Sequence, residues 1–229
     1  MIKNILFDMG GVIFLQDTAE AFRRFRKAGI NPDVYMGEYG QKDFFLDIET
    51  GRIDTGEFCR RMAAALGRDS VSYEEAQHCW LGFIKGVEQS RLDYLEALRG
   101  TYHLCLLTNT NPFIMAHTRS NRFCEAGKPI SDYFDSLFCS YEMKRYKPNR
   151  DFFAYALQAD HMQPHECVFL DDSIKNIQAA ESLGIRGLHV ATNEDWRTRL
   201  SKLLQSRLSP LLPLRDCLGS CSSETPGEP

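Results

Sequence analysis

The sequence predicts an α/β fold: a doubly wound, Rossmann-like parallel sheet with a block of helices inserted near its start. Two observations predict the sheet, because short apolar runs recur along the chain and helical patterns lie between most of them. A third predicts the insertion, since residues 16–87 show several helical patterns and no convincing strand. Strands that alternate with helices favour parallel pairing through right-handed crossovers. The carboxyl ends of the strands should therefore meet at one edge of the sheet.

Five apolar runs are short enough to be buried strands. The first runs from Lys3 into Asp8, and the others are His103–Leu107, Ser136–Cys139, Cys167–Leu170 and Gly187–Val190. The predicted helices of this part of the chain are Glu88–Arg99, Asp151–Gln158, Ile174–Leu183 and an amphipathic closing helix over Trp196–Leu208. Gly184 is well placed to end the helix Ile174–Leu183. We expect residues 1–15 and 88–208 to form this α/β core domain.

Residues 16–87 are expected to form a helical cap domain over the edge of the sheet. Asp54 is typical of a helix start, and Ser72 with Glu75 fits a capping box. The predicted helices of this insert are Thr18–Ala28, Asn31–Ile48, Thr55–Leu66 and Ser72–Ile84. At the other end of the chain, residues 209–229 show little periodicity and many prolines, serines and glycines, so we expect a disordered tail.

The composition narrows the classes of function. The chain has 229 residues, 43% of them hydrophobic and 25% charged, which suits one medium domain with an insertion. A net charge of −4 gives no reason to expect a nucleic acid or an acidic membrane surface as partner, and no uncharged apolar stretch is long enough to span a bilayer. The eight cysteines include no Cys-x-x-Cys pair, so we expect reduced thiols in a cytoplasmic protein. Oligomeric state has no signature in the sequence.

Four short segments carry candidate chemistry, and each follows a strand-like run or lies in a loop that the sheet would bring to the same edge. Asp8 ends the first strand and is followed by Gly10 and Gly11, which would let the backbone approach a ligand. The other segments are Thr108-Asn109, Lys147-Pro148 and Asp171-Asp172. A carboxylate nucleophile, hydroxyl and amide donors, one lysine and an acidic pair fit phosphoryl transfer with a hard cation such as Mg²⁺.

Each segment also has a purely structural interpretation. Asp8 could be the polar end of an ordinary strand, and Thr108 could satisfy a turn. Asp171 and Asp172 could cap the helix that follows, because a helix N-terminus attracts carboxylates. The presence of all the segments in one chain favours the functional interpretation over chance.

The four segments, in this order and at these separations, resemble the motifs of the haloacid dehalogenase (HAD) superfamily over about the first 195 residues. The resemblance implies a Mg²⁺-dependent phosphatase with a helical cap of subclass I and a small phosphorylated metabolite as its partner. It implies that Asp8 is the nucleophile and forms an aspartyl-phosphate. Asn176 would support the acidic loop, and the Mg²⁺ ligands would be Asp8, the Gly10 carbonyl, Asp171 and Asp172. The phosphoryl group would be bound by Gly10, Gly11, Thr108, Asn109 and Lys147, of which Thr108 and Lys147 also act in catalysis.

Gly10 departs from the pattern of the family phosphatases, which usually carry a second aspartate two positions after the nucleophile. That aspartate protonates the leaving group and then activates water. Glycine at this position, together with the Asn109–Asn111 run and the Lys147-Pro148 loop, resembles the α-D-glucose-1-phosphate phosphatase subgroup. An anomeric oxygen demands less protonation as it leaves, so we expect a sugar phosphate and in particular a sugar 1-phosphate.

Two alternatives stay open at this point. A 2-haloacid dehalogenase also lacks an aspartate there, although it does not need the metal that Asp171 and Asp172 suit. A catalytically weak phosphate-binding regulatory protein would keep affinity for phosphate and Mg²⁺ without turnover, although such a protein need not retain the nucleophile Asp8. A panel of phosphate esters with an Asp8→Asn control separates an enzyme from a binding protein.

Overall fold

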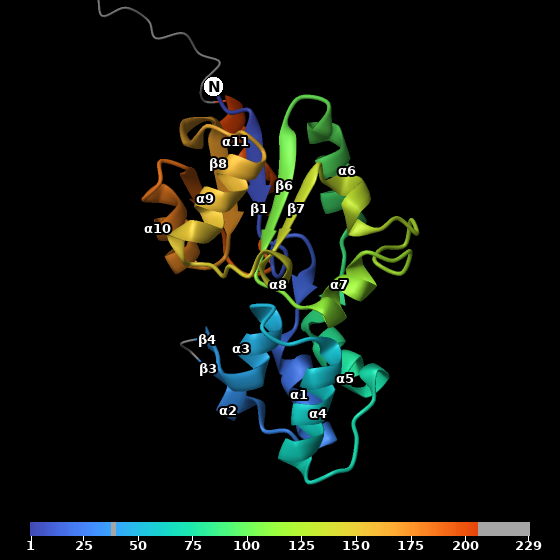
Figure 1. The fold of residues 1–229 in the computed structure, drawn as a ribbon. Coiled ribbons are helices and arrows are strands. Elements are labelled where there is room, and N and C mark those ends of the chain that lie inside the picture. The colour runs from blue at the N-terminus through green and yellow to red at the C-terminus, as the bar shows by residue number, and fades with distance from the viewer. Residues whose placement is uncertain (38–39, 206–229) are drawn as a thin grey trace, which may run out of the picture.

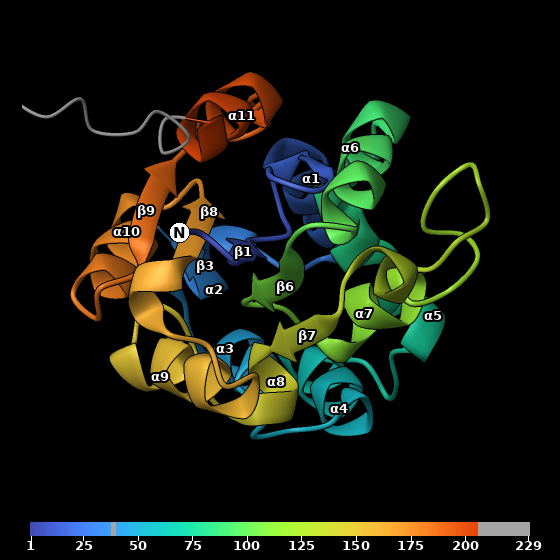
Figure 2. The same cartoon turned by 90° about the horizontal axis from the view of Figure 1, so that it is seen from above.

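The computed structural model describes residues 1–37 and 40–205. Its centre is a sheet of five strands in the order β7-β6-β1-β8-β9, in which every neighbouring pair is parallel. The strands are β1 (Asn4–Phe7), β6 (His103–Thr108), β7 (Ser136–Cys139), β8 (Cys167–Asp171) and β9 (Arg186–His189). The five apolar runs of the sequence form these five strands, and helices lie on both faces of the sheet (Figures 1 and 2). The predicted α/β fold is therefore confirmed.

Both faces of the sheet are buried, which explains why its strands are apolar throughout. Successive side chains of a strand point to opposite faces, so Ile5 and Phe7 belong to one apolar cluster and Leu6 to the other. The first cluster is completed by α6 (Gln89–Arg99), α7 (Pro112–Thr118) and α11 (Arg197–Gln205). The second is completed by α9 (Arg150–Ala159) and α10 (Ile174–Glu181).

The described part of the insert, residues 16–37 and 40–87, contributes five α-helices that lie beyond the carboxyl edge of the sheet (Figure 1). Asp54 and Ser72 cap two of them, because their side chains accept hydrogen bonds from the backbone N–H groups of Glu57 and Glu75. The helices are α1 (Thr18–Ala28), α2 (Pro32–Tyr35), α3 (Asp43–Glu49), α4 (Thr55–Leu66) and α5 (Tyr73–Trp80). Their shared core is aromatic, with ring centroids 5.1 to 5.9 Å apart among Phe25, Phe45, Phe58 and Trp80.

The expectation that residues 16–87 contain no strand is wrong. Two short antiparallel pairs lie there: β2 (Leu15–Gln16) with β5 (Ile84–Gly86), and β3 (Met36–Gly37) with β4 (Gly40–Gln41). The first pair forms where the chain enters and leaves the insert, so the two linkers run side by side. The second pair interrupts the helix predicted over Asn31–Ile48, since a glycine inside a helix costs about 1 kcal/mol and this stretch holds Gly37 and Gly40.

The remaining described elements are short. They are α8 (Ser140–Met143), which follows β7, and three 3₁₀ turns at Leu81–Phe83, Ile130–Tyr133 and Pro164–Glu166.

The closing helix is present as α11, while its predicted last residues, 206–208, and the predicted tail, 209–229, lie outside the described residues. The six described cysteines are free thiols and five of them are buried; Cys217 and Cys221 lie outside the described residues. Within 1–37 and 40–205, no helix is long and apolar enough to cross a membrane.

Candidate active site

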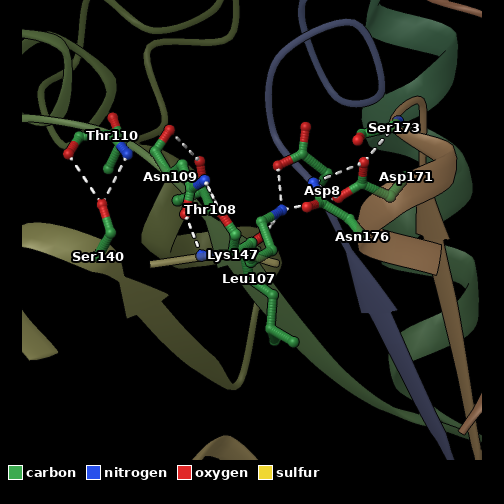
Figure 3. Close-up of polar contacts among 10 residues, drawn as sticks. All are labelled: Asp8, Leu107, Thr108, Asn109, Thr110, Ser140, Lys147, Asp171, Ser173 and Asn176. Atoms are coloured by element: carbon green, nitrogen blue, oxygen red, sulfur yellow. Dashed lines mark hydrogen bonds and ion pairs between the residues drawn. The ribbon is translucent and has the colours of Figure 1, made fainter. Parts of the chain in front are cut away.

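Three neighbouring strands deliver the predicted polar residues to one edge of the sheet. Asp8 directly follows β1, Thr108 ends β6 and Asp171 ends β8. Because β1 pairs with β6 on one side and with β8 on the other, these three residues lie close together. Figure 3 shows them with Lys147, which comes from the loop between α8 and α9. The segments identified in the sequence therefore meet at one place.

The Lys147 side chain lies at the centre of this group, and only 1% of it is exposed. Its Nζ lies 2.7 Å from Asp8 Oδ1 and 2.8 Å from Asp171 Oδ2, and it donates to the Leu107 carbonyl oxygen at 2.7 Å. These three acceptors match the three N–H donors of an ammonium group. Burial opposes the charge, but Asp171 and Asp8 outweigh it and raise the pKa of Lys147 above its ordinary value. The lysine is therefore a fixed cation at neutral pH.

The acidic pair at the end of β8 has two different environments. Asp171 is fully buried, and its carboxylate accepts from the Ser173 backbone N–H at 2.7 Å and from Asn176 Nδ2 at 3.0 and 3.1 Å, besides Lys147. Asp172 Oδ2 accepts from Thr192 Oγ1 at 2.6 Å. Burial raises the pKa of Asp172, with the Thr192 hydrogen bond opposing the rise. Asp171 is thus surrounded by donors, while Asp172 keeps more lone pairs available.

Three carboxyl groups of the site suit a hard cation. Asp8, Asp171 and Asp172 each offer an oxygen atom, and the three atoms lie within 4.8 Å of one another. Burial raises the pKa of Asp8 to about 7; Lys147 opposes that rise, and Asp171 and Asp172 add to it. Three carboxylates facing one lysine leave a local excess of negative charge, which a divalent cation would offset. A donor set made of oxygen alone is the one that Mg²⁺ prefers.

The two glycines after Asp8 lack a side chain for different reasons. Gly11 has a φ of +74°, and a Cβ there would lie 2.9 Å from Asp172 Oδ2, so only glycine fits. Gly10 does not have a positive φ, but a Cβ there would lie 2.6 Å from Gln16 Oε1. The Gln16 carboxamide therefore occupies the space into which a side chain at position 10 would extend.

Asn109 acts on the lysine loop through its side chain. Its Nδ2 donates to the Lys147 carbonyl oxygen at 2.9 Å, and its Oδ1 accepts from the Lys147 backbone N–H at 2.8 Å. This reciprocal pair fixes the loop that carries the cation. Thr108 is 1% exposed, and its hydroxyl donates to the Asn109 carbonyl oxygen at 3.3 Å, a long hydrogen bond that a ligand oxygen can replace. Direct contact of Thr108 and Asn109 with a substrate stays a prediction.

A cavity of about 180 Å³ lies between this edge of the sheet and the insert. Its wall includes Gly10, Thr108 and Asn109 from the core and Gln41, Glu49 and Trp80 from the insert. Three polar atoms of wall residues are buried without a hydrogen-bond partner in the described part of the chain: Gln41 Oε1, Trp80 Nε1 and Thr110 Oγ1. A buried polar atom without a partner costs about 1–3 kcal/mol. The cavity is therefore suited to a ligand that brings its own hydrogen-bonding groups.

Motifs in the sequence do not identify Glu49 and Tyr146, which also line this cavity. The Tyr146 hydroxyl donates to Glu49 Oε2 at 2.9 Å, and Gln41 Nε2 donates to Glu49 Oε1 at 2.8 Å. One signal of Glu49 exists in the sequence, because the other side chains that α3 buries are apolar. An acid on the apolar face of a helix is the feature that distinguishes it.

The family model of the haloacid dehalogenase-like hydrolases matches residues 2–184 of the chain. The chain belongs to this family. The matched range includes Asp8, Thr108, Lys147 and the Asp171-Asp172 pair, so the family predicted from these residues is confirmed and the protein is a hydrolase. The cap subclass and the resemblance to the α-D-glucose-1-phosphate phosphatase subgroup stay predictions.

Three similar proteins come from Bacteroides thetaiotaomicron and Porphyromonas gingivalis. D-ribitol-5-phosphate phosphatase of Bacteroides thetaiotaomicron is 38% identical over 207 residues, which are 90% of this chain and 100% of that protein. A HAD-like family hydrolase from Porphyromonas gingivalis has a TM-score of 0.85 at 34% identity, over 90% of this chain and 98% of that one. A HAD family enzyme from Bacteroides thetaiotaomicron, solved as a mutant with magnesium and inorganic phosphate, has a TM-score of 0.82 at 31% identity, over 87% of this chain and 99% of that one.

Proposed function

We propose that the protein is a Mg²⁺-dependent phosphatase that hydrolyses a small sugar or polyol phosphate through an aspartyl-phosphate intermediate. The observation that carries the proposal is the group of Asp8, Lys147, Asp171 and Asp172 at the carboxyl edge of the sheet. It combines a carboxylate nucleophile, a fixed cation and an oxygen-only metal site, which are the parts that phosphoryl transfer needs. The similar proteins support it, since one is a D-ribitol-5-phosphate phosphatase and another was solved with magnesium and inorganic phosphate.

Asp8 is the nucleophile of the proposed reaction. One of its carboxylate oxygens bonds to phosphorus while the bond from phosphorus to the leaving oxygen breaks. Water then attacks the aspartyl-phosphate, which releases orthophosphate and restores the carboxylate. Lys147 Nζ, 2.7 Å from Asp8 Oδ1, places a positive charge beside the transferring oxygens. The Thr108 hydroxyl and the Asn109 backbone N–H would donate hydrogen bonds to the same oxygens.

The residues of the site fit Mg²⁺. The second oxygen of Asp8, the Gly10 carbonyl and Asp172 would hold the ion, because Asp172 has lone pairs that its one hydrogen bond from Thr192 leaves available. Asp171 would lie beside this group, with its carboxylate occupied by Lys147 and Asn176. When bound, Mg²⁺ supplies positive charge that reduces the repulsion between the phosphate and the carboxylates.

The cavity supports a short, hydroxylated leaving group. Its 180 Å³ corresponds to about six water molecules at ~30 Å³ each, which suits a chain of a few carbons. Hydroxyl groups can pair with Gln41 Oε1, Trp80 Nε1 and Thr110 Oγ1, whereas an alkyl chain would leave these atoms unpaired. Within this class, the glycine at position 10 favours esters whose leaving oxygen needs little protonation, such as sugar 1-phosphates, unless another residue supplies the proton.

A panel of phosphate esters tests the proposal. Purified protein is assayed with and without Mg²⁺ on sugar 1-phosphates, D-ribitol 5-phosphate, acyl phosphates and plain alkyl phosphates, with Asp8→Asn as the control. We expect Mg²⁺-dependent release of phosphate from the hydroxylated esters and none from the Asp8→Asn variant. Release no greater than that of the control would overturn the phosphatase proposal. Equal rates on plain alkyl phosphates would retain the phosphatase and overturn its substrate class.

A further inference from the structure

On the core side of the site, neither position 10 nor Lys147 can give a proton to a leaving alcohol. Position 10 is glycine, and the adjacent space holds the Gln16 carboxamide, which does not exchange protons near neutral pH. Lys147 is paired with Asp8 and Asp171, which hold its proton firmly. An ordinary alkoxide is a poor leaving group unless it receives a proton in the transition state. Hydrolysis of an ordinary ester therefore needs a donor from another part of the molecule.

Glu49 is a carboxyl group in the wall of the same cavity. It is 5% exposed and shares that wall with Gly10, Thr108 and Asn109. It is the last residue of α3, and its backbone carbonyl accepts from Ser140 Oγ at 2.6 Å, which fixes it against the core at the end of β7. A substrate whose phosphoryl group lies at Thr108 and Asn109 would extend its leaving group towards the wall that Glu49 helps to form.

The groups that touch the Glu49 carboxyl are neutral. Gln41 Nε2 and the Tyr146 hydroxyl donate to its two oxygens, and Tyr146 is the titratable group among them. Within the described residues, no cation of the neighbouring elements forms an ion pair with it. Arg52 and Arg61 pair with Asp47 of α3, Arg119 pairs with Glu142 of α8, and Arg145 pairs with Asp151. Burial raises the pKa of Glu49 to about 7, with the Tyr146 and Gln41 hydrogen bonds opposing the rise. A carboxyl group in this range can both give and accept a proton at neutral pH.

We infer that Glu49, from the insert, is the catalytic acid and base of this site, in the role that position 10 leaves unfilled; the inference rests on the proposed phosphatase function. In the first step the Glu49 carboxyl gives its proton to the leaving oxygen as the bond to phosphorus breaks and Asp8 bonds to phosphorus. The alcohol then leaves, and water takes its place on the same side of phosphorus. In the second step the Glu49 carboxylate takes a proton from that water as the water attacks phosphorus and the bond to Asp8 breaks. The sum is ester plus water giving alcohol plus orthophosphate, with both carboxyl groups restored.

The role predicts a defect that depends on the leaving group. The value of kcat/KM reports the steps up to loss of the leaving group. Nitrophenolate can leave without being protonated, whereas an alkoxide needs a proton in order to leave. Glu49→Gln should therefore lower kcat/KM on D-ribitol 5-phosphate by about 10²–10⁴-fold and leave kcat/KM on 4-nitrophenyl phosphate within about tenfold of wild type. The same variant should lose the fall of kcat/KM above about pH 7 on D-ribitol 5-phosphate, because that fall reports loss of the Glu49 proton.

Glu142→Gln is the matched control, because it removes a carboxyl group that pairs with Arg119 outside the cavity and keeps the Glu49 carboxyl group. It should leave kcat/KM close to wild type on both esters, and thermal unfolding checks that each variant is folded. An equal loss on both esters in Glu49→Gln, or an unchanged pH profile, would show that Glu49 only positions the insert and would overturn the inference. Failure of the proposed function has a different signature: wild type would hydrolyse neither ester faster than Asp8→Asn does.

Discussion

Asp8 in the core is 14% exposed and Glu49 in the insert is 5% exposed, and burial raises the pKa of both carboxyl groups to about 7, yet their surroundings differ. Asp8 lies among charges, with Lys147 at 2.7 Å and two further carboxyl groups within 4.8 Å. Glu49 accepts hydrogen bonds from a tyrosine and a glutamine, which carry no charge. A bound cation would return Asp8 to its ionised form, whereas neutral donors leave Glu49 able to titrate.

This difference separates the two tasks of a phosphatase site. A nucleophile has to stay ionised, so it benefits from fixed positive charge. A proton carrier has to change its charge during the reaction, so it benefits from a dry, neutral environment. The sheet supplies the first environment and the insert supplies the second. Four experiments test this separation, from the largest expected effect to the smallest.

Asp8→Asn removes the proposed nucleophile and should lower Mg²⁺-dependent hydrolysis of every ester by about 10⁴-fold or more, since loss of a nucleophile is among the largest single-residue effects known. It also removes a buried charge, so the protein should stay folded. Release of phosphate and thermal unfolding measure the two effects. If activity were lost only on esters with poor leaving groups, the roles assigned to the two carboxyl groups would be reversed.

Lys147→Met leaves Asp8 and Asp171 buried without their cation and should lower the free energy of unfolding by about 3–5 kcal/mol. Denaturant unfolding of the metal-free protein measures it, and saturating Mg²⁺ should restore part of the loss. Lys128→Met is the matched control, because Lys128 pairs with Glu96 at the surface and its removal should leave stability close to wild type. Equal free energies of unfolding for the two variants would contradict the claim that Lys147 stabilises the fold by pairing with Asp8 and Asp171.

Glu49→Gln should remove a pH dependence of stability in the metal-free protein. The Glu49 pKa rises from 4.5 to about 7 on folding, so between these pH values the folded state keeps a proton that the unfolded chain has lost. The free energy of unfolding should therefore fall by about 3 kcal/mol as pH rises through this window, and the Glu49 contribution is complete only below it. Denaturant unfolding from pH 4.5 to 7.5 should show a smaller fall in Glu49→Gln. Glu142→Gln, which removes an acid paired with Arg119, should retain the wild-type fall.

Gly10→Asp with Gln16→Ala should move the acid back to the core. The second substitution clears the Gln16 Oε1 that a Cβ at position 10 would meet at 2.6 Å. In a Glu49→Gln background we expect the pair to recover kcat/KM on D-ribitol 5-phosphate by at least about tenfold, the low end of what a positioned acid contributes. Gln16→Ala alone in that background should recover nothing. Recovery by Gln16→Ala alone would mean that space, and not a proton, limits the Glu49→Gln variant.

The sequence predicted the core well because its signals are local. Each strand is a short apolar run between turn residues, and a parallel sheet has to bring the ends of such strands together. Asp8, Thr108 and Asp171 follow directly from that rule, since each stands at the end of a strand. Lys147 lies outside any strand, and its place before Pro148 and the family resemblance were needed to select it.

The insert was predicted less well because its important features are not local. The antiparallel pairing of β3 with β4 replaces a predicted helix, and the pairing of β2 with β5 joins residues about seventy positions apart. Glu49 gains its partner Tyr146 only after insert and core have come together, and it gains Gln41 only after β4 has packed beside α3 within the insert. Neither partner follows from a spacing in the sequence, so the wall of the cavity could not be derived without the fold.

The central claim is that Asp8 takes the phosphoryl group and Glu49 moves the proton, and trapping the intermediate tests it most directly. Without its base, the Glu49→Gln variant should form the aspartyl-phosphate from 4-nitrophenyl phosphate and hydrolyse it slowly. Acid quench during turnover with Mg²⁺, followed by peptide mass spectrometry, should find phosphate on Asp8 in Glu49→Gln at close to one per protein. It should find much less in wild type and none in Asp8→Asn with Glu49→Gln. Absence of phosphate from Asp8 in the trapped variant, or its presence on another residue, would contradict the account.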